Sequence, residues 1–371
     1  MNAPDLPDFT AADYEHMAHA LRLARRGLYT AHPNPRVGCV LVNDGKVVGK
    51  GWHRQTGAAH AEVAALEDAG DKARGATAYV TLEPCAHHGR TPPCAAALIA
   101  AGVSGVIAAI ADPNSLVAGK GRQALEDAGV SVRGGLLQDE ASGLNAGFLS
   151  RMQHGRPFVR LKMAASLDGR TAMSNGQSQW ITGAAARRDV QRLRASSGAV
   201  MVGIGTVLAD DPRLTVRLPD LDNAGMQPLR VVLDSELKMP PAARVLRLPG
   251  ETAVFCAAGN DPAALRDAGA KVFSVARRNG GLDLAAVLAR LAELKVNDVL
   301  VEAGQFLAGS LLAAGLLDEL VIYQAPHIMG SETRGMFATP AWETLDSKQL
   351  LEIIDVRKIG ADLRITARPA P

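Results

Sequence analysis

Hydrophobic and polar positions alternate along residues 1–150 in a way that predicts strands and helices in turn. Apolar residues at helical spacing, Met17, Leu21 and Ala24, follow Asp13, which we expect to cap a first helix. Because helices separate the later strands, the pattern predicts an α/β sheet covered on both faces. The other predicted strands are 37–42, 46–51, 76–82, 105–111 and 130–133, and the other predicted helices are 60–69, 92–101 and 121–128.

The pattern starts again after a polar segment at residues 151–157, which contains Gly155 and Pro157. We therefore expect two domains, residues 1–150 and 151–371, which suits a chain of 371 residues. The second domain is also predicted to be α/β. Its predicted strands are 158–163, 199–204, 230–234, 253–257 and 299–302, and its predicted helices are 182–195, 283–294 and 306–314.

Composition narrows the classes of partner. Lys and Arg number 40 against 38 Asp and Glu, and this near balance argues against a polybasic surface for nucleic acid or membrane. Aromatic residues make up only 4%, too few for a base-stacking platform. Four cysteines in a chain this long are no disulfide framework, and the N-terminus lacks the pattern of a signal peptide. We expect a cytoplasmic protein that acts on a small molecule.

Three residues of the first half have the character of metal ligands: His60, Cys85 and Cys94. One imidazole and two thiolates leave the fourth position of a zinc ion open to water, as in catalytic sites. Glu62 lies two residues after His60, and both reach one metal only if His60 precedes the first helical turn. Glu62 is then the predicted proton shuttle between water and a leaving amine.

The spacing of these residues resembles the zinc deaminase pattern H-x-E with P-C-x-x-C, although eight residues separate the two cysteines here. Two alternatives remain open. The cysteines are core residues and the histidine lies on the surface, or His87 or His88 closes a structural site as a fourth ligand.

In the second half, glycine follows two predicted strands, at residues 203–205 and at Gly304. A glycine turn that leads into a helix is a good seat for phosphate. Neither turn is a complete G-x-G-x-x-G, so an ordinary Rossmann domain is not indicated. A nucleotide with a further phosphate on its ribose requires a basic pocket, for which Arg277 and Arg278 are candidates.

Long motifs along the chain, among them HAEVAAL, LEPCAHHGRTPPC, RPFVRLKMAASLDGRTA and GTVLADDPRLTVR, resemble the bifunctional deaminase–reductases of riboflavin biosynthesis. The resemblance runs from about residue 13 to residue 322. It implies a cytidine-deaminase-like α/β/α sandwich followed by a dihydrofolate-reductase-like α/β domain that uses NADPH. The implied reactions are deamination of a phosphoribosylamino diaminopyrimidinone and reduction of its ribosyl group to ribityl. The alternative is a nucleobase or nucleic-acid deaminase with a non-reductase second domain. We further expect a homo-oligomer.

The resemblance also implies site residues. In the deaminase pocket these are Asn34, His53, His88, Arg90, Asp112 and Asn114, with Ser115 where the family usually has proline. Cofactor contacts are implied for Ala164, Trp180, Thr206, Asp210, Ser235, Gly304, Gln305, Phe306, Leu307, Ala308, Gly309 and Ser310. Contacts with the reductase substrate are implied for Ser178, Arg194, Leu214, Arg217 and Glu302.

Lys162, Asp210 and Trp180 each have a functional and an ordinary structural explanation. Lys162 and Asp210 are candidates for proton handling, and the two arginines Arg194 and Arg217 suit a phosphate because guanidinium binds it bidentately. Alternatively, Lys162 is a solvated strand residue, residues 210–212 form only a turn, and Trp180 is a core residue.

Overall fold

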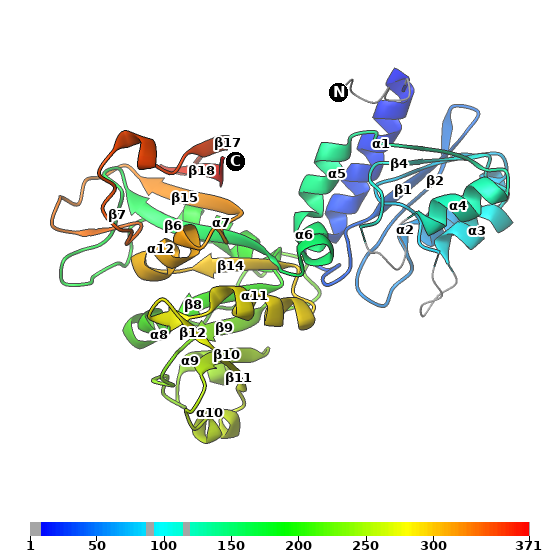
Figure 1. Cartoon of the computed structure of the whole chain (residues 1–371). Coiled ribbons are helices and arrows are strands. Elements are labelled where there is room, and N and C mark those ends of the chain that lie inside the picture. Colours follow the sequence, from blue (N-terminus) through cyan, green and yellow to red (C-terminus); the bar gives the residue numbers. More distant parts are fainter. Residues whose placement is uncertain (1–8, 87–92, 114–118, 371) are drawn as a thin grey trace. The chain divides into compact units, whose positions relative to one another are not determined.

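The computed structural model describes residues 9–86, 93–113 and 119–370 (Figure 1). It divides the chain into two compact units, Met1–Gly155 and Arg156–Pro371. A helix, Ala146–His154, runs across residue 150, and Gly155 ends it with a left-handed φ of 65°. The division therefore falls just after this helix, within the polar segment at residues 151–157.

The first unit contains a five-stranded sheet in the order β2-β1-β3-β4-β5. β1 is antiparallel to β2 and β3, and β3, β4 and β5 are parallel. Its strands are β1 (Gly38–Asn43), β2 (Lys46–Trp52), β3 (Thr77–Val80), β4 (Gly105–Ala108) and β5 (Ser131–Gly134). Its helices are α1 (Ala11–Ala24), η1 (Arg25–Gly27), α2 (Ala61–Ala69), η2 (Gly70–Ala73), α3 (Cys94–Ala100), α4 (Lys120–Asp127), α5 (Gln138–Leu144) and α6 (Ala146–His154).

Two glycines let helices approach this sheet closely from opposite faces. A Cβ on Gly38 would lie 2.1 Å from the Ala20 carbonyl oxygen of α1, and a Cβ on Gly51 would lie 2.3 Å from the Ala61 carbonyl oxygen of α2. Gly51 pairs with Cys39, the neighbour of Gly38, so the two glycines face opposite sides of the sheet. α1 and α2 therefore cover opposite faces, which is the expected sandwich.

The cap of α1 corrects one expectation. Thr10, not Asp13, is the N-cap residue, and its hydroxyl oxygen accepts from the Asp13 backbone N–H. Asp13 occupies the third helical position of a capping box and accepts from the Thr10 backbone N–H and the Tyr79 hydroxyl. Both residue types cap helices, so spacing alone did not separate them.

The second unit contains a nine-stranded sheet in the order β11-β10-β9-β8-β14-β6-β15-β18-β17. Strands from β11 to β15 are parallel, whereas β18 and β17 are antiparallel additions at one edge. Its strands are β6 (Phe158–Ser166), β7 (Arg170–Ala172), β8 (Ala199–Gly203), β9 (Leu229–Leu233), β10 (Thr252–Ala257), β11 (Lys271–Val275), β12 (Arg277–Arg278), β13 (Gly281–Leu282), β14 (Asp298–Glu302), β15 (Glu319–Ala325), β16 (Arg334–Gly335), β17 (Leu351–Ile359) and β18 (Asp362–Pro369). Its helices are α7 (Ala184–Ala195), α8 (Ile204–Asp210), α9 (Arg244–Arg247), α10 (Ala263–Asp267), α11 (Leu284–Glu293), α12 (Gln305–Ala313) and η3 (Leu345–Ser347).

The centre of this sheet contains the switch in strand order. β8 and β14 are parallel neighbours, yet the chain leaves β8 toward β9 and leaves β14 through α12 toward β15 on the other side. In open α/β sheets, ligands bind outside the carboxyl ends of the strands at such a point. Among the helices that the structure describes, none is both long and apolar enough to cross a membrane.

Candidate active sites

The first candidate site is a cluster of three side chains in the first unit. His60 is the N-cap residue of α2 and has an extended backbone, Cys85 follows β3, and Cys94 begins α3. The His60 Nδ1 atom lies 3.1 Å from the Cys94 Sγ atom and 3.6 Å from the Cys85 Sγ atom. The three ligand atoms all lie within 4.8 Å of one another. This geometry does not fit two core cysteines with an unrelated surface histidine.

The electrostatics of the two thiols suit a shared cation. The hydrogen bond from Cys94 lowers the pKa of Cys85 to about 4, and the same contact, with burial, raises the pKa of Cys94. A cation between the sulfur atoms favours both thiolates, and one nitrogen with two sulfur donors is a typical zinc set. The proposed fourth ligand of a structural site, His87 or His88, lies outside the described residues.

Glu62 lies in the first turn of α2, where its side chain is only 4% exposed. Burial raises the pKa of this carboxyl to about 7. Because His60 precedes the helix with an extended backbone, the two side chains can approach the same site despite their spacing of two. The structure therefore provides a carboxyl group suited to proton transfer beside the cluster.

Asn34 and His53 form a fixed pair next to His60. The ring of His53 lies 5.7 Å from that of His60 and is 3% exposed. Its Nδ1 lies 3.1 Å from the Ala59 carbonyl oxygen, which only accepts, so Nδ1 carries the proton. Its Nε2 then accepts from the Asn34 side-chain amide at 3.0 Å. Burial lowers the pKa of His53, so the ring is neutral and the Asn34 carbonyl oxygen is left as an acceptor.

Glu83 is a residue that sequence reasoning missed. It is 7% exposed and lies two residues before Cys85. Its carboxylate accepts from the backbone N–H groups of Asp112, Gly119 and Arg122, at 3.2, 3.3 and 3.2 Å. Glu83 thus fixes the predicted substrate residue Asp112 relative to the cluster. The other predicted pocket residues, His88, Arg90 and Asn114, and also Ser115, lie outside the described residues.

The second candidate site is a cavity of about 1390 Å³ within the second unit. It lies at the switch in strand order, because residues that follow both β8 and β14 line it. Most of the reductase residues implied by the sequence line this cavity: Lys162, Ala164, Ser178, Trp180, Arg194, Thr206, Asp210, Leu214, Arg217, Ser235, Glu302, Gly304, Gln305, Phe306, Leu307 and Ser310.

Three glycines on the cavity wall have no structural need to be glycine. Gly203 and Gly304 precede α8 and α12 with φ values of −85° and −78°, which any residue adopts. A Cβ on either, or on Gly205, would meet no protein atom within 4 Å. Close approach of a ligand to the backbone explains this choice, and a helix N-terminus behind it favours phosphate. The cavity therefore fits a pyrophosphate such as that of a nicotinamide dinucleotide.

A cluster of charged side chains, which consists of Lys162, Arg194, Arg217 and Glu302, lines another part of the cavity. Arg194 binds Glu302 through Nε and Nη2, at 2.6 and 2.8 Å, and donates through Nη1 to the Thr215 carbonyl oxygen. Lys162 lies opposite Glu302 in the neighbouring strand, and Arg217 also donates to Thr215. Three cations against one carboxylate leave this region positive. Most Arg194 donors are already used, so Arg217 is the freer of the two phosphate candidates.

Comparison with known proteins agrees with both sites. The family model of the cytidine and deoxycytidylate deaminase zinc-binding region matches residues 10–110, and the model of the RibD C-terminal domain matches residues 157–365. The riboflavin biosynthesis protein RibD of Escherichia coli is 49% identical over 360 residues, 95% of this chain and 98% of that protein. That of Haemophilus influenzae is 44% identical over 371 residues, 98% of this chain and 99% of that protein.

The chain belongs to the RibD family. Members of this bifunctional family join a zinc-binding deaminase to a reductase of riboflavin biosynthesis, and this chain contains both parts. The solved structure of Acinetobacter baumannii RibD superposes with a TM-score of 0.91 at 46% identity, over 97% of this chain and 99% of that one. The solved structure of a Thermotoga maritima deaminase/reductase superposes with a TM-score of 0.84 at 33% identity, also over 97% of this chain and 99% of that one. The match beyond residue 156 argues against a deaminase with an unrelated second domain.

Two of the implied cofactor residues, Ala308 and Gly309, do not line the cavity, because α12 turns them toward the protein interior. Ala308 is fully buried in the core, and a Cβ on Gly309 would lie 2.1 Å from the Ala338 carbonyl oxygen. The periodicity of a helix makes a run of seven consecutive ligand contacts impossible for its side chains.

Of the three ordinary explanations, the structure contradicts the one for Trp180. Trp180 is 69% exposed and stacks under the Arg187 guanidinium at 4.6 Å, so it is no core residue. Asp210 ends α8 and accepts from the Gln179 side-chain amide at 3.1 Å. Lys162 is half-buried in β6 at the cavity wall, and burial lowers the pKa of its ammonium group. All three remain available to a ligand in the cavity.

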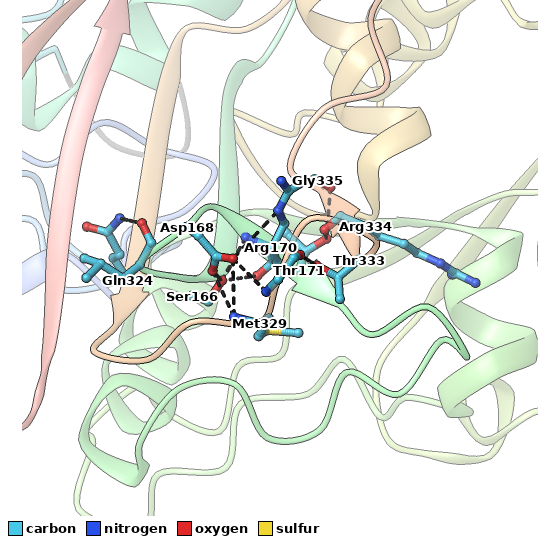
Figure 2. Close-up of polar contacts among 11 residues, drawn as sticks. Ser166, Asp168, Arg170, Thr171, Gln324, Met329, Thr333, Arg334 and Gly335 are labelled. Atoms are coloured by element: carbon cyan, nitrogen blue, oxygen red, sulfur yellow. Dashed lines mark hydrogen bonds and ion pairs between the residues drawn. The ribbon is translucent and has the colours of Figure 1, made fainter.

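One wall of the cavity is held by Asp168, in the turn between β6 and β7. Figure 2 shows the Ser166 side chain and the Met329 backbone directed toward Asp168. The carboxylate also accepts from the Gly330 N–H at 2.8 Å, and the Ser166 hydrogen bond lowers its pKa to about 2. β7 pairs with β16 here, and Thr171 and Arg334 of these strands line the cavity. Asp168 thus joins two segments distant in sequence to form that wall.

Proposed function

We propose that the first unit deaminates 2,5-diamino-6-(5-phosphoribosylamino)pyrimidin-4(3H)-one and that the second reduces the resulting 5-amino-6-(5-phosphoribosylamino)uracil with NADPH. The observation that carries the proposal is the pairing of two sites in one chain. One is the His60–Cys85–Cys94 cluster beside a buried Glu62, and the other is a positive, glycine-lined cavity. The Thermotoga maritima relative is described as the deaminase and reductase for these two compounds.

In the deaminase, His60, Cys85 and Cys94 would hold the metal. A zinc ion in this site would supply Lewis acidity, which makes water a nucleophile at neutral pH. Glu62 would carry one proton of the attacking water to the leaving amine while the other passes to the ring nitrogen, so that the ring carbon gains oxygen and loses ammonia. The Asn34 carbonyl oxygen, oriented by neutral His53, accepts from an N–H group of the pyrimidine. Asp112, held by Glu83, forms a further part of the pocket.

In the reductase, the glycine turns before α8 and α12 receive the pyrophosphate of the cofactor. NADPH bound in the cavity would supply the hydride for the first ribosyl carbon of the ring-opened imine. Lys162 and Asp210, which both line the cavity, are our candidates to donate the accompanying proton. Arg217 binds the substrate phosphate, and the Arg194–Glu302 pair holds that part of the wall in position.

The purified protein incubated with the diaminopyrimidinone phosphate, with and without NADPH, tests the proposal. We expect ammonia release in both incubations and the ribityl product only with NADPH. Ammonia release that requires NADPH, or no ammonia in either incubation, would refute the assignment of the first unit. Ammonia release without any ribityl product would refute that of the second.

We also propose that the protein is a cytoplasmic homo-oligomer. All four cysteines are free thiols, and a thiolate zinc site needs reducing surroundings. The edge strand β17 exposes Ile353 at 65% and Val356 at 54%, and an apolar edge strand is a natural pairing surface for a second copy. Sedimentation tests this proposal: Ile353→Lys is expected to shift the protein to monomer, and an unchanged oligomer would exclude β17 as the interface.

A further inference from the structure

In dinucleotide-binding βαβ units, the residues at the end of the second strand set the preference between NADH and NADPH. β8, α8 and β9 form a parallel βαβ unit, and its glycine turn lines the cavity. In such units that bind NAD, an acidic residue near the end of the second strand accepts from the ribose hydroxyl groups. Asp234 directly follows β9 and would be that acid by position.

Asp234 cannot take this role, because its carboxylate is used inside the protein. It is 0% exposed, and its two oxygens accept from the backbone N–H groups of Lys238 and Met239 at 2.9 and 2.7 Å. The next residue, Ser235, faces the cavity instead. A hydroxyl group therefore stands where an acid would repel a phosphate on the ribose.

A hairpin brings a cation to the same end of the cavity. Its first strand, β12, consists of Arg277 and Arg278, and Arg277 lies 3.8 Å from Glu236, one residue after Ser235. This ion pair connects the hairpin to the segment that follows β9. Arg278 is the neighbour of Arg277 in the strand, and it lines the cavity whereas Arg277 does not.

The charge of Arg278 is not neutralised within the described part of the chain, where no carboxylate lies within ion-pair distance of it. The nearby acids are engaged elsewhere: Glu236 with Lys238 and Arg277, and Asp283 as the cap of α11. Another cavity arginine, Arg244, is paired with Asp211 at 3.5 Å. Arg278 is thus an exposed guanidinium that lines the same cavity as Ser235 and is suited to bidentate contact with a phosphate.

We propose that Arg278 binds the 2′-phosphate that distinguishes NADPH from NADH and so sets the cofactor preference of the second unit. The inference rests on the proposed use of a nicotinamide dinucleotide by this cavity. The matched control is Arg277, which has the same charge and the adjacent position but is directed to Glu236. Its ion pair is exposed and adds little to stability, so its removal leaves the hairpin folded.

Equilibrium binding of NADP⁺ and NAD⁺ to the full-length protein, measured by calorimetry, tests the proposal without turnover. We expect Arg278→Ala to weaken NADP⁺ binding by about 10- to 100-fold, the value of a charge-assisted contact, and NAD⁺ binding by less than about 2-fold. Arg278→Lys should recover part of the loss, and Arg277→Ala should bind both nucleotides as the wild type does. Binding of adenosine 2′,5′-bisphosphate, which carries the 2′-phosphate, should be weakened by Arg278→Ala as NADP⁺ binding is, and binding of AMP should be as little affected as NAD⁺ binding.

Three outcomes would overturn the proposal: equal losses for both nucleotides in Arg278→Ala, no loss for either, or an equal loss of NADP⁺ binding in Arg277→Ala. Wild-type protein that binds NAD⁺ as tightly as NADP⁺ would also overturn it while leaving the reductase assignment intact. Wild-type protein that binds neither nucleotide would instead refute the proposed reductase function itself.

Discussion

Glu62 is buried and Glu302 is half-buried at the cavity wall, and their neighbours give the two carboxyl groups different properties. Burial raises the pKa of Glu62 to about 7. Burial acts in the same direction on Glu302, but the adjacent Arg194 and Lys162 more than offset it, so the pKa of Glu302 is lowered. A carboxyl group that exchanges protons near neutrality suits acid–base work, and one that stays charged suits an ion pair. The sequence alone does not distinguish the two.

Replacing Glu62 tests the proton shuttle. We expect Glu62→Gln to lower the rate of ammonia release by about 10²- to 10⁴-fold, because the amide cannot carry the proton. Zinc content and NADPH-dependent reduction of supplied deaminated substrate should not change. Glu67→Gln, at an exposed position of the same helix, is the control and should behave as wild type. Undiminished deamination in Glu62→Gln would remove Glu62 from the mechanism.

The two arginines of the positive region should differ in what their loss does. Arg194→Ala removes the bidentate partner of the half-buried Glu302 carboxylate and should reduce the free energy of unfolding of the second unit by about 1–3 kcal/mol. Arg217→Ala should leave stability nearly unchanged and raise KM for the phosphorylated substrate more than KM for NADPH. Urea denaturation and steady-state kinetics measure both effects. An Arg194→Ala protein of wild-type stability would contradict the structural role.

At the scale of elements, Glu83 connects β3 to the segment that begins at Asp112 and to the start of α4. We expect Glu83→Gln to raise KM for the deaminase substrate, because the amide N–H faces backbone N–H donors and loosens that segment. Zinc content and reductase activity should remain. Arg122→Ala removes a side chain from the same region but keeps its backbone N–H, and it serves as the control. An equal rise of KM in both variants would argue against the proposed role of the Glu83 carboxylate in holding this segment.

Regular periodicity explains which elements were predictable. The helix of residues 60–69 was expected and occurs as α2, because one of its sides packs into a core. The buried strands 199–204 and 299–302 were expected and occur as β8 and β14, because both of their faces pack into core clusters. The last strands were not expected. Five of the nine β17 residues are large apolar side chains, but most of β17 is exposed, so its pattern does not follow burial.

The predictability of the sites has the same limits. Residue type and spacing together predict the deaminase cluster, since metal ligands and a proton shuttle require particular side chains: His60, Glu62, Cys85 and Cys94. Glu83 does not, because its partners are backbone groups 29 to 39 residues away, which no side-chain pattern records. Ala308 points into the protein interior because of its position in the α12 helix, and the sequence motif does not show which side of the helix faces the cavity.

For the whole molecule, the two proposed activities use separate sets of residues. The metal cluster lies within residues 60–94, and all cavity residues lie within 162–334. Among the described residues, no hydrophobic core cluster combines members of both units. Each unit therefore has its own core and its own site, and removal of one cofactor should leave the other activity in place.

Zinc removal tests this central claim most directly. The purified protein is treated with a chelator, and ammonia release and NADPH oxidation on supplied deaminated substrate are then measured in the same sample. We predict that ammonia release falls to background and returns with added zinc, while NADPH oxidation keeps its initial rate throughout. Deamination that persists in protein shown by elemental analysis to hold no metal, or a reductase rate that falls together with deamination, would contradict the account.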